Sequence, residues 1–253
     1  MFLGKNADRN TSKEVMAAVV SMNAIDLAEL VPKTSGEGLF RYVNDLLQYI
    51  GPATEEYGGK LVGVSHGGIT AVFEGSCEDA LMSSVSVCQR IAGNTNELFS
   101  HQNFTVGLHY GTVYTDQVGY GSWRTPLTIS ESTDSARKLQ TAAGRYSAHI
   151  LISEDAVKQI PDFFTKFNSR SLGNIMGDGT AVYDVFDGDP LEIKLSKRRS
   201  KLFFETGIAL FGEKQYAAAR SHFIEIIKSD RSDRAAKEYL YLCDRIMSGE
   251  ATE

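Results

Sequence analysis

The sequence predicts an α+β fold, a ferredoxin-like sandwich followed by a small all-helical C-terminal extension. Over most of the chain, short strand-like apolar runs alternate with helical periods, in the order strand, helix, hairpin, helix, strands, helix, strand. From about residue 197 onward the pattern is helical throughout. We therefore expect two units, at residues 13–187 and 197–250.

The first unit is predicted to begin with a buried strand and a helix. The continuous apolar run over residues 15–22 is typical of a buried strand, although its length alone leaves a helix possible. Thr34 and Glu37 have the spacing of a capping box and precede an apolar face at helical period. The helix is expected to end near residues 57–59, where two glycines follow a tyrosine.

A hairpin and a second helix are predicted next. Residues 60–64 and 69–73 have strand patterns and are joined by the tight turn at residues 65–68. Ser76 and Asp79 mark the start of the second helix. Further elements complete a plan related to the βαββαβ motif. They are strands at residues 104–108, 112–114 and 149–152, and a third helix at residues 130–146.

The C-terminal unit has the apolar spacing of a tetratricopeptide helix pair. This spacing is set by Phe203, Gly207, Leu210, Tyr216, Ala219 and Phe223. A break at residues 230–233 precedes a third helix at residues 235–247. One such unit cannot bury its apolar face alone, so we expect it to pack on the main domain, on a partner protein or on a twin chain.

Composition excludes several classes of protein. The net charge of −6 and the isoelectric point near 5.5 argue against a nucleic-acid partner. No apolar stretch approaches the roughly 18 residues that span a bilayer, and the apolar start is too short for a signal peptide. Cys77, Cys88 and Cys243 are few and widely spaced, which suits reduced thiols, so we expect a cytoplasmic protein. The basic run at residues 194–201 is interpreted as a solvated linker leading into a helix, in preference to a phosphate-binding or membrane-binding patch.

Four ordered segments resemble the class III adenylate/guanylate cyclase catalytic domain. They lie at residues 58–73, 106–113, 129–139 and 150–154, and the resemblance covers about residues 13–187. It implies the palm-type sandwich of a nucleotide cyclase. The diguanylate cyclase domain is a second candidate, because residues 66–68 are similar to its glycine pair. However, Ile69 and Thr70 stand where that family has acidic residues.

The resemblance also implies where the active-site residues should be. Class III cyclases carry two magnesium ions on two aspartates, and the matching positions here are Asn23 and Gly67. The two purine-reading positions correspond to Gly63 and Leu127, which cannot hydrogen-bond a base edge.

The two remaining positions lie on the third predicted helix. The transition-state asparagine and arginine of the family correspond to Asp134 and Lys138. Lys138 keeps the positive charge without the bidentate fork of an arginine. A slip of one residue in the alignment would place Thr133 and Arg137 there instead.

These substitutions lead to a functional hypothesis. Loss of one preorganised electrostatic group typically costs about 10²–10³ in rate, and all six positions differ. The sequence therefore predicts a catalytically inactive pseudoenzyme without metal or cofactor. Its expected role is a signalling or regulatory interaction module that forms a homodimer and can dock a protein partner on its C-terminal helices.

Two alternatives stay open at the level of the sequence. One is a divergent nucleotide-binding protein or cyclase with a rebuilt active site, which would use Asp26, Glu131, Asp134, Arg137 or Lys138. The other is a plain structural domain within a larger assembly.

Overall fold

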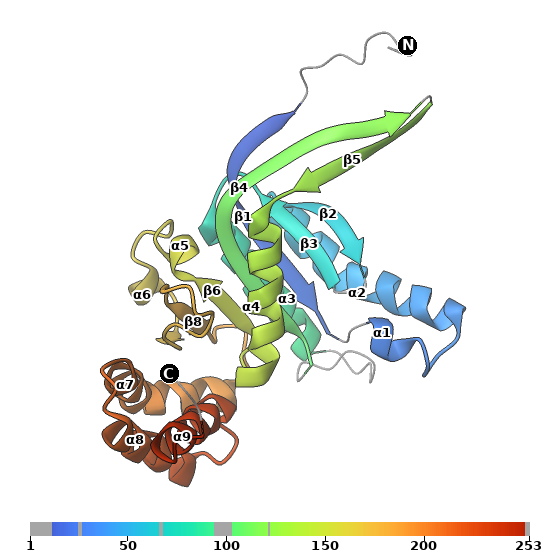
Figure 1. Cartoon of the computed structure of the whole chain (residues 1–253). Helices are drawn as coiled ribbons and strands as arrows, with labels where there is room; N and C mark the ends of the chain where they lie inside the picture. Colours follow the sequence, from blue (N-terminus) through green and yellow to red (C-terminus); the bar gives the residue numbers. More distant parts are fainter. Residues whose placement is uncertain (1–11, 25–26, 66–67, 94–102, 121, 251–253) are drawn as a thin grey trace.

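A computed structural model describes residues 12–24, 27–65, 68–93, 103–120 and 122–250. Within these ranges eight strands form one sheet with the order β2-β3-β1-β4-β6-β8-β7, and β5 pairs with β4 away from this path (Figure 1). The first four strands have the order 4-1-3-2 and are antiparallel to their neighbours. This is the sheet of the βαββαβ plan, so the predicted α+β fold is confirmed.

The elements follow the predicted order closely at first. The strands are β1 Lys13–Asn23, β2 Lys60–Ser65, β3 Gly68–Phe73, β4 Thr105–Tyr120, β5 Trp123–Ile129, β6 Ile150–Ser153, β7 Ser169–Ser171 and β8 Val182–Val185. The helices are α1 Leu27–Leu30, α2 Gly36–Glu56, α3 Cys77–Ala92, α4 Glu131–Tyr146, α5 Glu154–Val157, α6 Phe163–Lys166, α7 Leu191–Gly212, α8 Tyr216–Ser229 and α9 Arg234–Met247.

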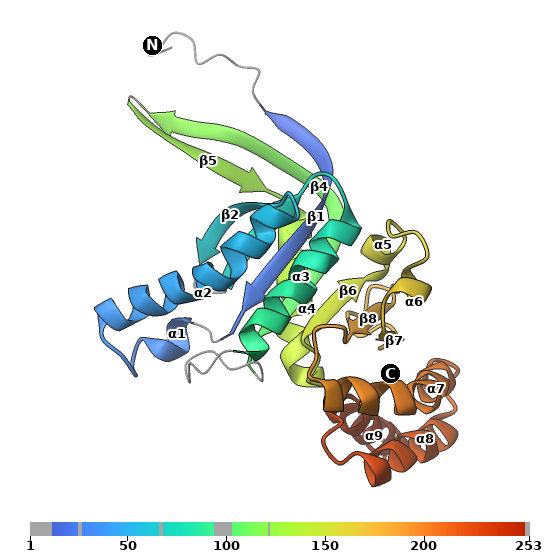
Figure 2. The same ribbon diagram turned by 180° about the vertical axis from the view of Figure 1, so that it is seen from behind.

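Helices cover both faces of the sheet. Helices α2 and α3 lie on one face and α4 lies on the other, as the two opposite views show (Figures 1 and 2). Alternation along β1 explains this arrangement, because Ala18 and Val20 join the cluster of α2 and α3 while Val19 packs with Ala136 of α4. Helix α4 sits close to the backbone of β4, since a Cβ on Gly107 would lie 2.0 Å from the carbonyl oxygen of Ala136.

Strand β4 is longer than the sequence pattern indicates. The two strands predicted at residues 104–108 and 112–114 are one element, which continues to Tyr120 and pairs antiparallel with β5. This β4–β5 ribbon projects from the domain at the end opposite α7–α9 (Figure 1). The sequence pattern is interrupted there, because Asp116 in the outer part of β4 and Pro126 within β5 are residue types that strands rarely contain.

The C-terminal helices pack on the main domain. Phe204, Phe223 and Tyr239 belong to the same buried cluster as Leu139 of α4 and Leu151 of β6. Of the three coverings expected for this unit, the structure shows packing on the main domain. The linker prediction for residues 194–201 is wrong, because the basic run lies inside α7. None of the helices in the described ranges is long and apolar enough to cross a membrane.

Candidate functional site

Asn23 ends β1 at the edge of the core. It pairs with Thr105 of β4 and is almost fully buried. The Thr105 hydroxyl donates to the Asn23 carbonyl oxygen at 3.4 Å and accepts from the Gln140 side-chain amide at 2.6 Å. The end of β1 is therefore tied to β4 and to α4 by neutral hydrogen bonds.

The start of β3 lies directly against Asn23. A Cβ on Gly68 would lie 2.4 Å from the Met22 carbonyl oxygen and 3.0 Å from the Asn23 Cβ. Gly68 also has a φ of +121°, a conformation that side chains other than glycine rarely adopt. Gly67, the second predicted metal position, lies outside the described residues. Its neighbour Gly68 nevertheless shows that this end of the hairpin meets the end of β1.

The residues around Asn23 do not fit a two-magnesium centre. Magnesium prefers carboxylate oxygens, whereas Asn23, Thr105 and Gln140 offer neutral groups. Among the described residues, no group of three or more His, Cys, Asp or Glu side chains could hold a metal ion. Asp26, the alternative acidic candidate, lies outside the described residues.

Helix α4 presents its candidate residues to solvent. The helix begins after Ser130, whose hydroxyl oxygen accepts from the backbone N–H of Ser132 at 2.9 Å. Asp134 and Arg137 form an exposed ion pair of 3.1 Å, and Lys138 is also exposed. The buried residues of α4 recur at helical period and face the sheet. They include Ser132, Ala136, Leu139, Gln140 and Ala143. Asp134 and Lys138 therefore point away from the sheet and from Asn23.

Gly63 and Leu127 are also separated within one chain. Gly63 lies on β2 and pairs with Thr70, and a Cβ added to it would meet open space. Leu127 lies on β5, pairs with Asp116 and is exposed. Strands β3, β1 and β4 stand between β2 and β5 in the sheet. One chain thus does not bring the two predicted base-reading positions together.

Glu131, a candidate of the rebuilt site, and His109 of β4 both have local roles. Glu131 is exposed in the first turn of α4, where a negative charge stabilises the helix N-terminus. His109 is half-buried on β4, with its Nδ1 3.0 Å from the Ser153 hydroxyl. Burial lowers the pKa of His109 below its ordinary value.

A buried network of charged residues escaped the sequence analysis. Arg170 of β7 contacts Asp184 of β8 at 3.1 Å and Asp233, the N-cap of α9, at 2.6 Å. Lys197 of α7 contacts Asp184 at 3.0 Å and Asp189 at 2.8 Å. The network joins the sheet to α7 and α9.

His149 extends the network to the start of β6. Its Nδ1 lies 2.6 Å from the Asp189 carboxylate. A cavity of 580 Å³ opens beside the network and is lined in part by His149, Arg170, Lys197 and Asp233. These buried charges are already paired within the network, so the cavity alone does not define a ligand site.

Opposing effects set the pKa values in this network. Burial alone would raise the pKa of Asp233, but the Arg170 guanidinium, the Ala236 backbone N–H and Lys197 together outweigh burial and hold that pKa below its ordinary value. Burial and Lys197 oppose each other in the same way at Asp189, and its pKa is also lowered. The sequence does hold a signal for this network, because β7 and β8 each carry one charged residue inside a short strand. Arg170 lies between two serines, and Asp184 lies between Tyr183 and Val185.

Comparisons with known proteins show similarity to nucleotide cyclases. An adenylate cyclase of Anabaena cylindrica is 26% identical over 138 residues, which cover 50% of this chain and 28% of that protein. A bacterial light-regulated adenylyl cyclase has a similar structure, with a TM-score of 0.61 at 14% identity, covering 76% of this chain and 58% of that chain. The dimeric guanylyl cyclase domain of the RhoGC fusion protein from Blastocladiella emersonii has a TM-score of 0.56 at 17% identity, covering 68% and 97%. No family model matches the chain.

The chain is therefore similar in sequence to adenylate cyclase, and its α+β sheet with flanking helices is the fold of adenylyl and guanylyl cyclase catalytic domains. The chain spans 28% of the length of this adenylate cyclase, so the activity of that whole protein does not transfer directly. The prediction that the chain is not an enzyme is contradicted, because the relative is named an adenylate cyclase and the structural neighbours are cyclases.

Proposed function

We propose that the chain is a catalytic domain of the nucleotide cyclase type with a rebuilt active site. It converts a purine nucleoside triphosphate into the 3′,5′-cyclic monophosphate and pyrophosphate. The observation that supports this best is the pair of exposed cations on α4, Arg137 and Lys138, carried by a fold shared with cyclases.

In this proposal the site uses the positions indicated by the resemblance. They are Asn23, Gly63, Gly67, Leu127, Asp134 and Lys138. Gly63 and Leu127 contact the purine through apolar surface and offer it no hydrogen bonds. Discrimination between adenine and guanine is therefore weak, because a site rejects an analogue strongly only when it hydrogen-bonds the true substrate.

The two cations of α4, Arg137 and Lys138, stabilise the negative charge that develops during the reaction. The ribose 3′-hydroxyl gives its proton to water and bonds to the α-phosphorus, while the bond from that phosphorus to pyrophosphate breaks and pyrophosphate leaves. Negative charge grows on the departing pyrophosphate, where Lys138 and Arg137 stabilise it. Asp134 holds Arg137 in place through its ion pair of 3.1 Å.

The proposed site lies between two copies of the chain. Lys138 points away from Asn23 within one chain, so a second copy must supply one of the two. The β4–β5 ribbon offers an apolar surface for this dimer. Its exposed apolar side chains are Tyr114, Val118, Tyr120, Trp123, Leu127 and Ile129. Closed two-fold pairing is the commonest form of oligomer, and one structural neighbour is a dimeric cyclase domain.

Mixing two inactive variants tests the shared site. In this proposal the side-chain amide of Asn23 hydrogen-bonds the triphosphate, so Asn23→Leu and Lys138→Ala each disable both sites of their own homodimer. In an equal mixture half of the dimers are mixed, and each has one intact site of two, so about a quarter of the wild-type activity returns. Lack of any recovery, with both variants shown to be folded dimers, would contradict the shared site. An inactive wild-type chain would contradict the cyclase proposal itself.

A further inference from the structure

Helix α7 carries an apolar stripe that the rest of the described chain leaves uncovered. Leu191, Leu195 and Leu202 are 70%, 46% and 74% exposed. At 3.6 residues per turn, these positions fall within about 40° of one another around the helix axis. Arg198 lies on the same stripe between Leu195 and Leu202, and it is also exposed.

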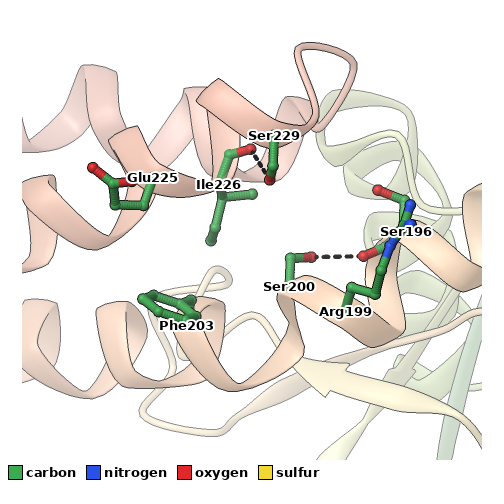
Figure 3. A pocket seen from close by; sticks show the side chains of 7 residues that line it. All are labelled: Ser196, Arg199, Ser200, Phe203, Glu225, Ile226 and Ser229. Carbon is green, nitrogen blue, oxygen red and sulfur yellow. Dashed lines mark hydrogen bonds between the residues drawn. The ribbon is translucent and has the colours of Figure 1, made fainter.

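A groove between α7 and α8 adjoins this stripe. It has a volume of 480 Å³, and Figure 3 shows Arg199 at one end and Glu225 at the other. Phe203 is half-exposed along one side and faces Ile226 across the groove. The hydroxyls of Ser200 and Ser229, which also line it, donate to backbone carbonyl oxygens of their own helices. The groove therefore combines an apolar middle with charged ends.

The charge of this surface differs from that of the whole chain. Within the described residues, neither Arg198 nor Arg199 has a carboxylate within ion-pair distance, whereas Lys194 contacts Asp187 at 2.8 Å and Lys197 is buried in the charged network. Two exposed arginines among the described residues thus have no carboxylate partner, although the net charge of the whole chain is −6. This favours a partner that brings negative charge.

The same arginines argue against a second copy of the chain on this surface. A two-fold axis that pairs Leu195 of one α7 with Leu202 of the other places Arg198 and Arg199 against the same arginines of the second copy. Like charges at the centre of an interface cost several kcal/mol. The surface also lies at the end of the molecule away from the β4–β5 ribbon, so the proposed dimer leaves it free (Figure 1).

We propose that the outer face of α7, with the groove beside α8, docks an acidic amphipathic helix of a partner protein. Apolar side chains of that helix, spaced i, i+4, i+7, cover the leucine stripe, and one of them enters the groove beside Phe203. Acidic side chains next to this apolar face pair with Arg198 and Arg199. A concave groove that receives a side chain favours a helix over the flat surface of a lipid bilayer.

A synthetic peptide tests this proposal on the full-length chain. The probe is a fluorescein-labelled helix of about 18 residues with leucines at i, i+4, i+7 and i+11 and glutamates at most other positions. Fluorescence anisotropy is expected to show saturable binding. The double variant Arg198→Glu/Arg199→Glu is expected to weaken binding at least about 10-fold, and Leu202→Ser is expected to weaken it as well. All three positions are exposed, so these changes preserve the fold, which circular dichroism checks.

Control experiments distinguish an acidic helix from the other possible occupants of this surface, a lipid bilayer and a second copy of the chain. Arg41→Glu changes the charge of an exposed arginine on α2 and is expected to leave peptide binding unchanged. A peptide with lysines in place of the glutamates should not bind, and equal binding of that peptide overturns the proposal. Sedimentation with phosphatidylserine vesicles, without peptide binding, overturns it in favour of a lipid surface. Dissociation of the dimer by Leu202→Ser overturns it in favour of a second copy.

Discussion

Arg170 and Asp233 form a buried two-pronged ion pair between the sheet and the N-terminus of α9. The Nη1 atom of Arg170 lies 2.6 Å from Oδ2 of Asp233, and Nη2 lies 3.2 Å from Oδ1. The guanidinium also lies over the ring of Phe204 on α7, with its centre 4.3 Å from the ring centroid. This one arginine thus contacts two of the three C-terminal helices, which makes those helices part of the folded core.

Removing Arg170 is predicted to destabilise the chain strongly. Arg170→Ala leaves Asp233 buried without its cation, and breaking a buried pair in this way costs about 3–5 kcal/mol. Arg145→Ala serves as the control, because Arg145 forms an exposed pair with Glu238 at 2.9 Å, which contributes about 1 kcal/mol or less. Urea unfolding of both variants checks the difference, and equal losses would contradict the role assigned to Arg170.

Stability is predicted to fall as the solution becomes acidic. The folded pKa of Asp233 is below its ordinary value, so its contribution is fully present above about pH 4 and is lost as the pH falls from there through the folded pKa. Asp233→Asn should be less stable at neutral pH and should show a flatter dependence on pH. Urea unfolding between pH 7 and pH 3 measures both slopes. Identical slopes would mean that Asp233 is not the titrating group.

Gly68 is predicted to tolerate no side chain. In Gly68→Ala the new Cβ would clash with the Met22 carbonyl oxygen at 2.4 Å, and the φ of +121° adds strain. We expect a loss of more than 1 kcal/mol and a displaced hairpin beside Asn23. Gly63→Ala is the matched control, since its Cβ meets open space on β2. Thermal unfolding compares the two, and similar midpoints would show that the hairpin end does not press on β1.

Deleting everything after Ser196 is predicted to cause aggregation. The deletion uncovers apolar side chains of the main domain, including Leu139, Ala143 and Leu172. It also removes Lys197 and Asp233 from the charged network. The soluble fraction and light scattering measure the effect. A truncated chain that stays soluble and equally heat-stable would show that the helices are a separate appendage.

The sequence was sufficient for the core of the fold. The buried run of β1 and the capped periods of α2, α3 and α4 are local signals, and the structure places these elements where the patterns predict. The outer ribbon was not predicted, because Pro126 within β5 and Asp116 within β4 are residue types that strands rarely contain. The start of α7 was placed too late, since charged Lys197 was assumed to be solvated although its partners lie far away in the chain.

The candidate site was only partly predictable. The ends of β1 and of the hairpin follow from local pattern, and Gly68 confirms that they meet. The sequence could not show that Lys138 points away from Asn23, because that depends on how α4 packs on the sheet. The buried network depends on residues as distant as Arg170 and Asp233, and no local pattern pairs them.

Formation of cyclic nucleotide by the purified chain tests the central claim most directly. ATP or GTP is supplied with Mg²⁺, and cyclic AMP and cyclic GMP are measured by mass spectrometry against a heat-denatured control. The account predicts product above that control, a fall of about 10²-fold in Lys138→Ala, and no change in Lys237→Ala, an exposed lysine on α9. The cyclase proposal would be contradicted if the folded, dimeric chain formed neither cyclic AMP nor cyclic GMP. Full activity in Lys138→Ala would also contradict it.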